Sequence, residues 1–492
     1  MSSKNRPKAA LSSKLTKFRL ALLYSFPAAL FCSYYPLIHI SESASTNYEF
    51  SLALIWLFFF ALFSLKDALY YAYNTIKIFT KKRTFRTVLP LLALLFPLYL
   101  SATALWSSNP LRAVLTSGIF WCIIISAIGI IKLAQAKLIN KAAFLKIFLL
   151  TSCVFCAFCW LQSLLDVLGV DRDITLLCPG CTSYSFGFPH PSGFAIEPQF
   201  MGNLLLAPVF LSLHLWLKSK SEKTVFSSRA LLAISFFLLS TLFLTFSRGA
   251  IYSFLLGFAL LLILNLTKLK NRHTLKIVPL VLVSFLLVLG CQGLASKYSN
   301  YSRGFTCGVT SAISQLSLGT VALDCDNPAT STQPTSPAQT TQSEQPSSAP
   351  IFSGYVEEST NARMNFNRIA LELSPKTTKT LLFGYGLGSA GEIMYKEGKT
   401  TTPYEIVQNE PLSLLLETGL LGLLLLAFLL LAIFSQIAKI NRTERLLFWA
   451  VFLAYACSLL FFSGLPNALH IYLFPVFLAI ALPALPSVSK KS

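Results

Sequence analysis

Residues 230–266 read ALLAISFFLLSTLFLTFSRGAIYSFLLGFALLLILNL, an apolar stretch in which Arg248 is the single charged residue. As one helix it would be about 55 Å long, well beyond a hydrocarbon core of about 30 Å. Two short spans joined by a tight turn at Ser247-Arg248-Gly249 would fit a membrane and place Arg248 at its outer surface. A single span would reverse every later loop and turn basic segments outward, against the positive-inside rule. The stretch therefore predicts two transmembrane helices and not one.

The rest of the chain repeats this pattern of long apolar blocks. Of its 492 residues, 54% are hydrophobic and 12% charged, which is more apolar than a soluble protein of this length requires. Uninterrupted apolar runs in lipid fit helices, because only helices and closed barrels satisfy the backbone there. The sequence thus predicts an all-α polytopic membrane protein with about twelve transmembrane helices. The predicted spans are Leu20–Ile38, Phe50–Leu65, Val88–Leu105, Ala113–Ile131, Ala143–Leu168, Phe200–Leu217, Ala230–Phe246, Ala250–Leu266, Ile277–Leu294, Leu412–Phe434, Leu446–Phe462 and Leu469–Leu485.

The distribution of the basic residues that give the net charge of +20 agrees with the same topology. With the N-terminus inside, the predicted inner segments carry 29 of the 40 Lys and Arg residues. This is the bias expected of cytoplasmic loops, and it explains the basic composition without a nucleic-acid partner.

Five segments follow from these spans and charges. Residues 1–19 are predicted to form a cytoplasmic tail and 20–294 nine transmembrane helices. Residues 295–410 form one large extracytoplasmic segment between the ninth and tenth helices, 411–486 the last three helices, and 487–492 a second cytoplasmic tail. A polar excursion of this size among short loops is where chemistry at the outer face would take place.

Within that excursion, residues 327–350 are rich in Ser, Thr, Pro and Gln and contain almost no apolar residues. Such a composition cannot bury enough surface to fold, so this part is predicted to be disordered.

Four of the 11 cysteines lie in predicted outer loops. An even number on an oxidising side permits two disulfides, most simply Cys178–Cys181 and Cys307–Cys325. The alternative is a Cys-x-x-Cys metal site, but no matching Cys or His set lies nearby in the sequence. The sequence predicts no metal.

Arg248 is the sharpest candidate for chemistry. A guanidinium between two apolar helices is costly unless an anion pairs with it, although an anchor that reaches the headgroups is the alternative. Arg363 and Arg368 lie five residues apart in the outer segment, and a solvated charge is the favoured interpretation of Arg368.

Other polar residues near the ends of the spans have both functional and structural interpretations. The carboxylates Glu197 and Glu410, at the outer ends of their helices, could act on a substrate or simply balance the helix dipole. Glu417, about a turn and a half inside the next apolar block, could be functional or could pair with an Arg for structure. The alternating glycines Gly384, Gly386 and Gly388 could approach a ligand or form a turn, and His190 lies in a polar loop.

The order of these motifs resembles the O-antigen ligase and O-antigen polymerase superfamily, which also includes bacterial oligosaccharyltransferases that glycosylate Ser or Thr. The motifs are Phe246–Ala250 (FSRGA), Leu381–Ser389 (LLFGYGLGS), Gln408-Asn409 and Glu417–Gly422 (ETGLLG), preceded by Ser192–Pro198 (SGFAIEP). The resemblance covers roughly residues 193–422, and the earlier spans are similar only in number and apolarity.

The resemblance implies a glycosyltransferase in the bacterial inner membrane that needs no cofactor. It would take a glycan from an undecaprenyl-pyrophosphate carrier at the outer face and move it to a hydroxyl of a lipid, glycan or protein acceptor. Arg248 and Arg363 would bind the pyrophosphate, because planar guanidinium forks match its charge and geometry. Gln408, Asn409 and the backbone at Gly384 and Gly386 would contact substrate.

One departure concerns the general base. Ligases of this superfamily typically have His-Asn where this chain has Gln408-Asn409, and a glutamine cannot accept the proton. Glu410 and Glu197 are then the candidates, with His190 third, unless no base is required. The substitution favours a polymerase or a divergent transferase over a strict lipid A ligase.

Three alternative functions stay open at this point, one of which is a membrane sensor or scaffold that uses the outer segment for binding. A protein O-oligosaccharyltransferase lies within the same superfamily. A secondary transporter could also have twelve spans, but transporters usually show related halves, and here the one large excursion comes late.

The topology can be tested with introduced cysteines. A cysteine at Ser336 is expected to react with an impermeant thiol reagent in cells that lack an outer permeability barrier, whereas one at Lys268 is expected to be protected. Labelling of the cysteine at Lys268 with protection at Ser336 would reverse the predicted orientation.

Overall fold

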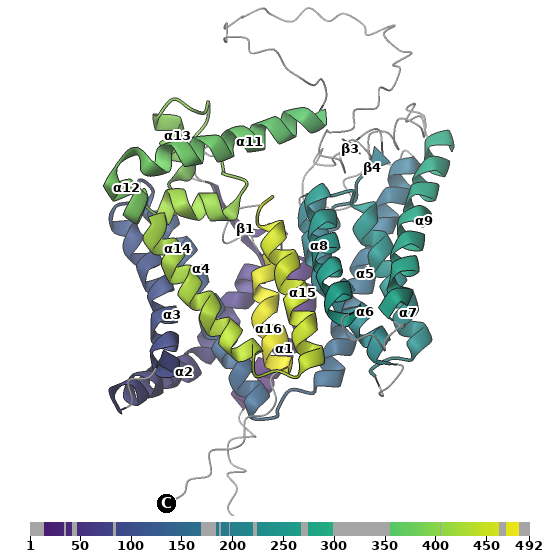
Figure 1. Ribbon diagram of the computed structural model, residues 1–492, viewed down its shortest axis with the longest axis horizontal. Coiled ribbons are helices and arrows are strands. Elements are labelled where there is room, and N and C mark those ends of the chain that lie inside the picture. Colours follow the sequence, from purple (N-terminus) through teal and green to yellow (C-terminus); the bar gives the residue numbers. More distant parts are fainter. Residues whose placement is uncertain are drawn as a thin grey trace, which may run out of the picture.

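The computed structural model describes residues 14–33, 36–41, 47–81, 85–168, 184–185, 188–195, 197–219, 224–266, 274–298, 355–403, 405–461 and 469–481 (Figure 1). The segment 327–350 and the cysteines Cys178, Cys181, Cys307 and Cys325 lie outside these residues, so their predicted disorder and disulfides stay predictions.

A helix coincides with each of the twelve apolar blocks. Six of these helices are long and apolar enough to cross a membrane, namely α2, α4, α5, α6, α9 and α14, and shorter apolar helices lie in α3, α7 and α8. The chain is therefore a helical, multi-pass membrane protein, and the number twelve remains a prediction. The helices are α1 (Lys14–Phe31), α2 (Leu52–Lys81), α3 (Phe85–Ala102), α4 (Pro110–Gln135), α5 (Lys141–Val167), α6 (Pro198–Lys218), α7 (Ser228–Leu244), α8 (Arg248–Leu266), α9 (Ile277–Tyr298), α14 (Glu410–Ile437), α15 (Arg442–Ser458) and α16 (Leu473–Ala481), with short 3-10 turns at η2 (Thr103–Leu105), η4 (Thr274–Lys276) and η6 (Leu469–Tyr472).

Two short antiparallel hairpins were missed by the sequence reasoning. Strand β1 (Pro36–Ser41) pairs with β2 (Asn47–Ser51), and β3 (Tyr184–Ser185) pairs with β4 (Phe188–Pro189). The first predicted span was wrong at its end, because α1 stops at Phe31 and not at Ile38. Pro36 cannot continue a helix and restricts the residue before it, and the β-branched residues that follow suit a strand.

The helix α6 lies at the centre of the right-hand group of helices in Figure 1. Over its hydrophobic window 83% of the residues are buried, against 39% or less in the other long apolar helices. Helix α6 packs against α7, α8 and α15, so protein side chains cover most of its surface. Small residues allow the close approach, as at Gly202 beside the Ala250 methyl group.

The predicted interruption at Ser247-Arg248-Gly249 is confirmed. Helix α7 ends at Leu244, Phe246 has a positive φ of 46°, and α8 begins at Arg248. The Ser247 hydroxyl oxygen accepts a hydrogen bond from the Ala250 N–H at 3.3 Å, which caps the start of α8.

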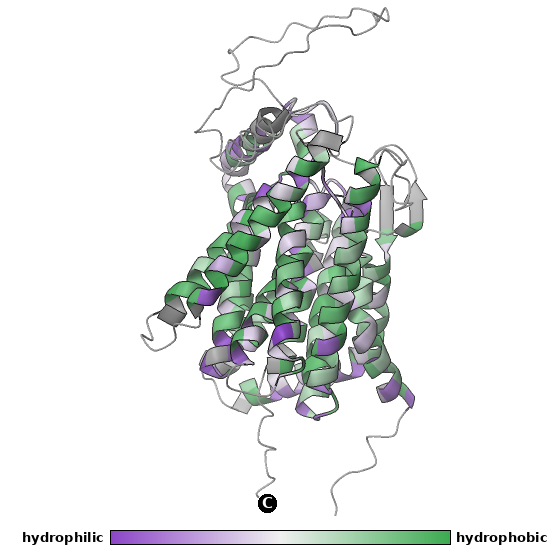
Figure 2. Cartoon of the chain, turned by 90° about the vertical axis from the view of Figure 1, so that its right-hand side faces the viewer, coloured by the Kyte–Doolittle hydropathy of each residue, from purple (hydrophilic) through white to green (hydrophobic). Residues whose placement is uncertain are grey.

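The bundle is apolar in the middle and hydrophilic toward both ends (Figure 2). Lys218 at the end of α6 pairs with Glu444 at the start of α15, with Nζ and Oε1 3.3 Å apart. The start of α15, which carries Glu444, lies at the lower end of the bundle in Figure 1, whereas α11 (Tyr355–Leu373), α12 (Thr378–Phe383) and α13 (Ala390–Lys396) lie at the upper end. These three helices form what we call the outer layer.

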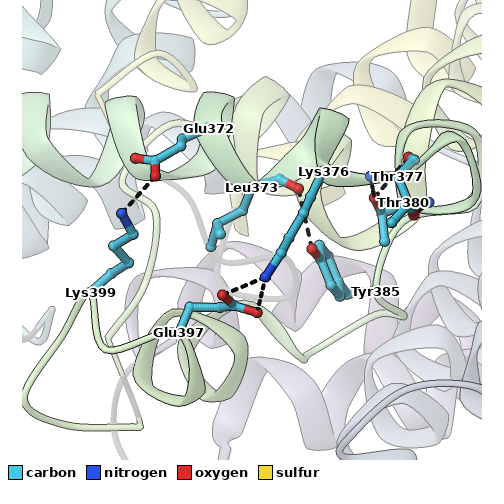
Figure 3. Close-up of polar contacts among 8 residues, drawn as sticks. All are labelled: Glu372, Leu373, Lys376, Thr377, Thr380, Tyr385, Glu397 and Lys399. Atoms are coloured by element: carbon cyan, nitrogen blue, oxygen red, sulfur yellow. Dashed lines mark hydrogen bonds and ion pairs between the residues drawn. The ribbon is translucent and has the colours of Figure 1, made fainter.

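The outer layer has a small core of its own. Residues from α11, α13 and the start of α14 pack together, with Tyr385 at its edge; the buried members are Ile369, Ala370, Leu373, Ala390, Met394, Val407 and Leu416. The 3-10 turn η5 (Ser374–Lys376) joins α11 to α12. Figure 3 shows two ion pairs that tie the later part of the layer back to α11 and η5, Lys376–Glu397 and Lys399–Glu372, each with N and O 2.6 Å apart.

Helix α14 is broken at Gly419, whose φ of 65° and ψ of −171° are not helical. Its first part lies across the bundle in Figure 1, and the part after the break descends through it. The 18 residues 420–437 extend for about 27 Å, close to the thickness of a hydrocarbon core. Glu417, which the sequence places about a turn and a half inside an apolar block, therefore lies two residues before the break.

Backbone pairing at this break joins the outer layer to the bundle. The Tyr385 N–H donates to the Leu416 carbonyl at 3.0 Å, and the Gly386 N–H donates to the Glu417 carbonyl at 2.8 Å. The Tyr99 hydroxyl lies 2.8 Å from the Thr418 carbonyl oxygen. These three contacts use carbonyls that the broken helix leaves without a regular partner.

The alternating glycines 384, 386 and 388 make the close approach possible. All three have φ between 70° and 97°. A Cβ at Gly384 would collide with the Glu417 backbone, and one at Gly386 with the Ser107 backbone. The neighbouring Leu387 is bonded on both sides, since its N–H donates to Thr103 Oγ1 at 3.2 Å and its carbonyl accepts from Ser107 Oγ at 2.9 Å.

The substitution Gly386→Ala is expected to lower stability, because it combines an unfavourable positive φ with a backbone collision. A residue held in such a conformation costs about 1–3 kcal/mol before any collision is counted. The midpoint of thermal unfolding of the purified, detergent-solubilised protein measures the effect. Gly118→Ala on α4 is the control, because nothing lies within 4 Å of its added Cβ; equal midpoints for the two variants would contradict the role given to Gly386.

Candidate functional site

Three segments far apart in the sequence meet at Arg363 of α11. Its Nε donates a hydrogen bond to Gln408 Oε1 at 2.5 Å, just before α14. Its Nη2 donates to Gln199 Oε1 at 3.3 Å, in the first turn of α6. Gln199 in turn donates from Nε2 to the Phe461 carbonyl at 2.9 Å. Arg363 is thus held between the outer layer and the most buried helix of the bundle.

The start of α8 lies beside the same glutamine. Arg248 begins α8, is half-buried and is followed by Gly249, where an added Cβ would lie 3.0 Å from Gln199 Nε2. Tyr252, one turn further along α8, lies with its ring 6.2 Å from that of Phe461. The Arg363 side chain and the backbone that carries Arg248 thus both lie close to Gln199.

Glu197 lies at the rim of this region, as the N-cap residue of α6. Its residue surface is exposed, yet desolvation of the carboxyl by surrounding atoms raises its pKa above the ordinary value, and the charge of Arg363 partly opposes the rise. A carboxyl beside Arg363 with a raised pKa is a better proton acceptor than an ordinary glutamate.

Glu410 is buried, with 4% of its surface exposed, in the first turn of α14. Its N–H donates to the Leu459 carbonyl at 2.8 Å, which fixes the start of α14 against the end of α15. Asn409 is the N-cap, and its Oδ1 accepts from the Leu412 N–H at 3.2 Å. Asn409 therefore has a structural role that the sequence interpretation did not include.

A polar pocket opens beside Glu410, between α4, α13 and the start of α14. Its lining combines one guanidinium, three carboxylates and small or hydroxyl-bearing residues, namely Arg112, Thr116, Leu387, Gly388, Ala390, Gly391, Glu405, Ile406, Val407, Glu410, Ser413, Leu414 and Glu417. Hydroxyl groups of a sugar pair well with such a mixture of donors and acceptors.

Glu417 faces the start of α13. Its Oε1 accepts a hydrogen bond from the Ala390 N–H at 3.1 Å, where α13 begins. A carboxylate at a helix N-terminus is a favourable partner for the helix dipole, so the structural interpretation of Glu417 gains support.

The other predicted residues are distributed around the site. His190 is buried, and its ring lies 5.3 Å from that of Phe246, two residues before Arg248. Arg368 is exposed on α11. Gly384 and Gly386 lie against the break in α14, which explains their residue type, and their predicted contact with substrate stays a prediction. Among the described residues, no group of three or more His, Cys, Asp and Glu side chains is arranged to hold a metal ion.

Sequence reasoning missed Gln199 and Arg112. Gln199 is a polar residue in the first turn of α6, directly after Glu197-Pro198 and directly before the predicted span that begins at Phe200. Arg112 is one of few basic residues that the charge count places outside, apart from the large excursion. Gln199 and Arg112 could both be singled out in the sequence, but the sequence did not identify the residues that they contact.

Residues 233–427 match a family model described as O-antigen ligase. The match begins within α7 and ends within α14, so it contains Arg248, Arg363, Gln408 and Glu410 and excludes Glu197 and Gln199. No curated protein matches the chain.

Proposed function

We propose that this chain, a member of the O-antigen ligase family of membrane glycan transferases by its residues 233–427, transfers a glycan from an undecaprenyl-pyrophosphate carrier to an acceptor hydroxyl at the outer face of the membrane. The observation that carries the proposal is the convergence of Arg363 and the Arg248–Gly249 turn on Gln199. The family match, together with Arg363 and the start of α8 at one glutamine, supports a site for a diphosphate.

The reaction exchanges one C–O bond for another. The acceptor oxygen attacks the anomeric carbon, the bond from that carbon to the diphosphate oxygen breaks, and the diphosphate leaves with the electron pair. Arg248 and Arg363 would stabilise the charge that grows on the leaving group, which is the largest contribution that fixed donors can make. No step requires a metal or a redox partner.

The proton of the acceptor hydroxyl must pass to a base. Gln408 donates or accepts hydrogen bonds but takes up no proton, and here its Oε1 is used by Arg363. Glu197 beside Arg363 and Glu410 in the polar pocket are the two carboxylates placed to act. The polar pocket, which contains Glu410, would then lie near the acceptor hydroxyl.

The orientation follows from the charges. The end of the bundle that carries Lys218, Lys439 and the α4–α5 loop would face the cytoplasm, and the outer layer would face outward in the bacterial inner membrane. The acceptor could be a lipid, a growing glycan or a protein. Gln408 in place of histidine favours polymerisation or a divergent transfer over lipid A ligation.

Substitution of the arginines tests the diphosphate site. Arg248→Ala and Arg363→Ala are each expected to lower glycan transfer in washed membrane vesicles by roughly ten- to hundred-fold or more, while the protein still inserts. Loss of one charge-assisted hydrogen bond, about 1.5–3 kcal/mol, corresponds to roughly ten- to hundred-fold in rate. Arg248→Lys should also be strongly impaired, because a point charge replaces a bidentate fork.

Arg368→Ala is the matched control, since Arg368 is exposed on the same helix as Arg363. Normal transfer by the Arg248→Lys protein would instead identify Arg248 as an anchor at the membrane surface and remove it from the site.

Substitution of the carboxylates tests the base. A large loss of transfer in Glu410→Gln with near-normal Glu197→Gln would assign the base to Glu410, and the reverse would assign it to Glu197. If Glu197 is the base, activity should fall on the acidic side of the pH profile at a pH above the ordinary range of a glutamate, because its pKa is raised. Near-normal activity in both variants would show that neither carboxylate takes the proton.

A further inference from the structure

The guanidinium of Arg363 is held by two glutamine amides from different parts of the chain. Gln408 Oε1 accepts from Nε and Gln199 Oε1 accepts from Nη2, at 2.5 and 3.3 Å. The two acceptors contact different nitrogens, so together they fix both the position and the rotation of the planar group.

We propose that Gln199 and Gln408 are positioning residues that aim Arg363 at the diphosphate of the donor. The proposal rests on the proposed function and adds to it the two residues that orient one of its arginines.

Gln199 is itself fixed before it meets Arg363. It is buried, with 8% of its surface exposed, and its Nε2 donates to the Phe461 carbonyl at 2.9 Å. That bond leaves its Oε1 facing Arg363, because the amide carries donor and acceptor on opposite sides. A lone amide would rotate, whereas this one is held by the backbone beyond α15.

The neighbourhood of Gln199 also explains why the residue after Arg248 is glycine. A side chain at position 249 would begin 3.0 Å from Gln199 Nε2 and 3.1 Å from Phe461 Cβ. Because Gly249 has no side chain, the N-terminus of α8 approaches Gln199 closely. Arg248 and Arg363 therefore belong to two elements that both lie against Gln199.

The residue type matters as much as the contact. An amide oxygen accepts a hydrogen bond from a guanidinium without adding a negative charge. A carboxylate at the same place would form a charge-assisted, bidentate pair with Arg363 and would compete with a diphosphate for it. A neutral acceptor therefore orients the guanidinium and leaves its charge to act on the ligand.

The same reasoning gives Gln408 a role of its own. The family resemblance leads one to expect a histidine there, with a proton-accepting nitrogen. In this chain the position supplies a neutral oxygen to Arg363 Nε. Gln408 thus acts through Arg363, and it is not a catalytic residue in the sense of contacting the reacting atoms.

The test separates the effect of an added charge from the effect of a lost hydrogen-bond acceptor at Gln199 and Gln408. Gln→Glu keeps the length and an acceptor oxygen but adds a charge, whereas Gln→Met keeps the length and removes the acceptor. The full-length protein in detergent is titrated with undecaprenyl diphosphate to obtain Kd, and its thermal unfolding midpoint is measured in parallel. Arg363→Ala is the reference for loss of the guanidinium.

Gln436 supplies the matched control. It lies at the other end of α14, where its Oε1 accepts from Lys439 Nζ at 3.0 Å, so it is also a glutamine that receives a hydrogen bond from a cation. Gln436→Glu should leave Kd for undecaprenyl diphosphate unchanged.

The Glu and Met variants are expected to differ in binding. Gln199→Glu and Gln408→Glu should each raise Kd at least tenfold, because the new carboxylate pairs with Arg363. The unfolding midpoint of Gln408→Glu should equal or exceed that of the unsubstituted protein, whereas Gln199→Glu also loses the hydrogen bond to the Phe461 carbonyl and should gain no stability. Gln199→Met and Gln408→Met should raise Kd only severalfold. If the two glutamines have only a structural role, the Met and Glu variants should both lower the unfolding midpoint, and the folded proteins should keep the Kd of the unsubstituted protein.

The outcomes separate this inference from the proposed function. If Arg363→Ala weakens binding but the Glu variants bind as the unsubstituted protein does, the positioning role is overturned and the diphosphate site stands. If the unsubstituted protein binds undecaprenyl diphosphate no better than undecaprenol, the proposed function fails and the inference fails with it.

Discussion

The pairing of the 385–386 backbone with the 416–417 backbone is the interaction on which the arrangement of the site depends. It occurs where Gly419 breaks α14, and it ties the outer layer to a helix of the bundle through hydrogen bonds of 2.8 and 3.0 Å. Because α11 packs on α13 and the start of α14, the position of Arg363 is fixed through this junction. Without the break, α14 would continue as one straight helix, and its first part would not lie across the bundle where α11 packs on it.

A second constraint is the placement of charge at a membrane surface. Guanidinium groups are costly in an apolar bundle unless polar partners or water surround them. Here two glutamine amides, Gln199 and Gln408, accept hydrogen bonds from Arg363, and the Phe461 carbonyl holds Gln199 in place. Both of these acceptors are neutral, whereas Glu197 is a carboxyl beside Arg363. The candidate site therefore lies between the outer layer and the outer ends of the transmembrane helices.

Much of the fold could be predicted from the sequence because its causes are local. Apolar length and the positive-inside bias located the helices, and Ser247-Arg248-Gly249 marked the turn between α7 and α8. The break at Gly419 could not be predicted, since a glycine in a leucine-rich run is common in membrane helices and the break is stabilised by a segment 30 residues earlier. For the same reason Gln199 was missed: its partner Arg363 lies 164 residues away. Arg248 and Arg363 could be singled out by residue type alone. The contacts of Arg363 with Gln199 and Gln408 could be found only in the structure.

The central claim is that Arg248 and Arg363 bind one diphosphate at the outer end of the bundle. The most direct measurement is a cryo-electron microscopy structure of the full-length protein with undecaprenyl diphosphate in a lipid nanodisc. The account predicts density for the two phosphates within hydrogen-bond distance of both guanidinium groups, beside Gln199. Phosphate density at the lower end of the bundle, or contact with neither arginine, would contradict it.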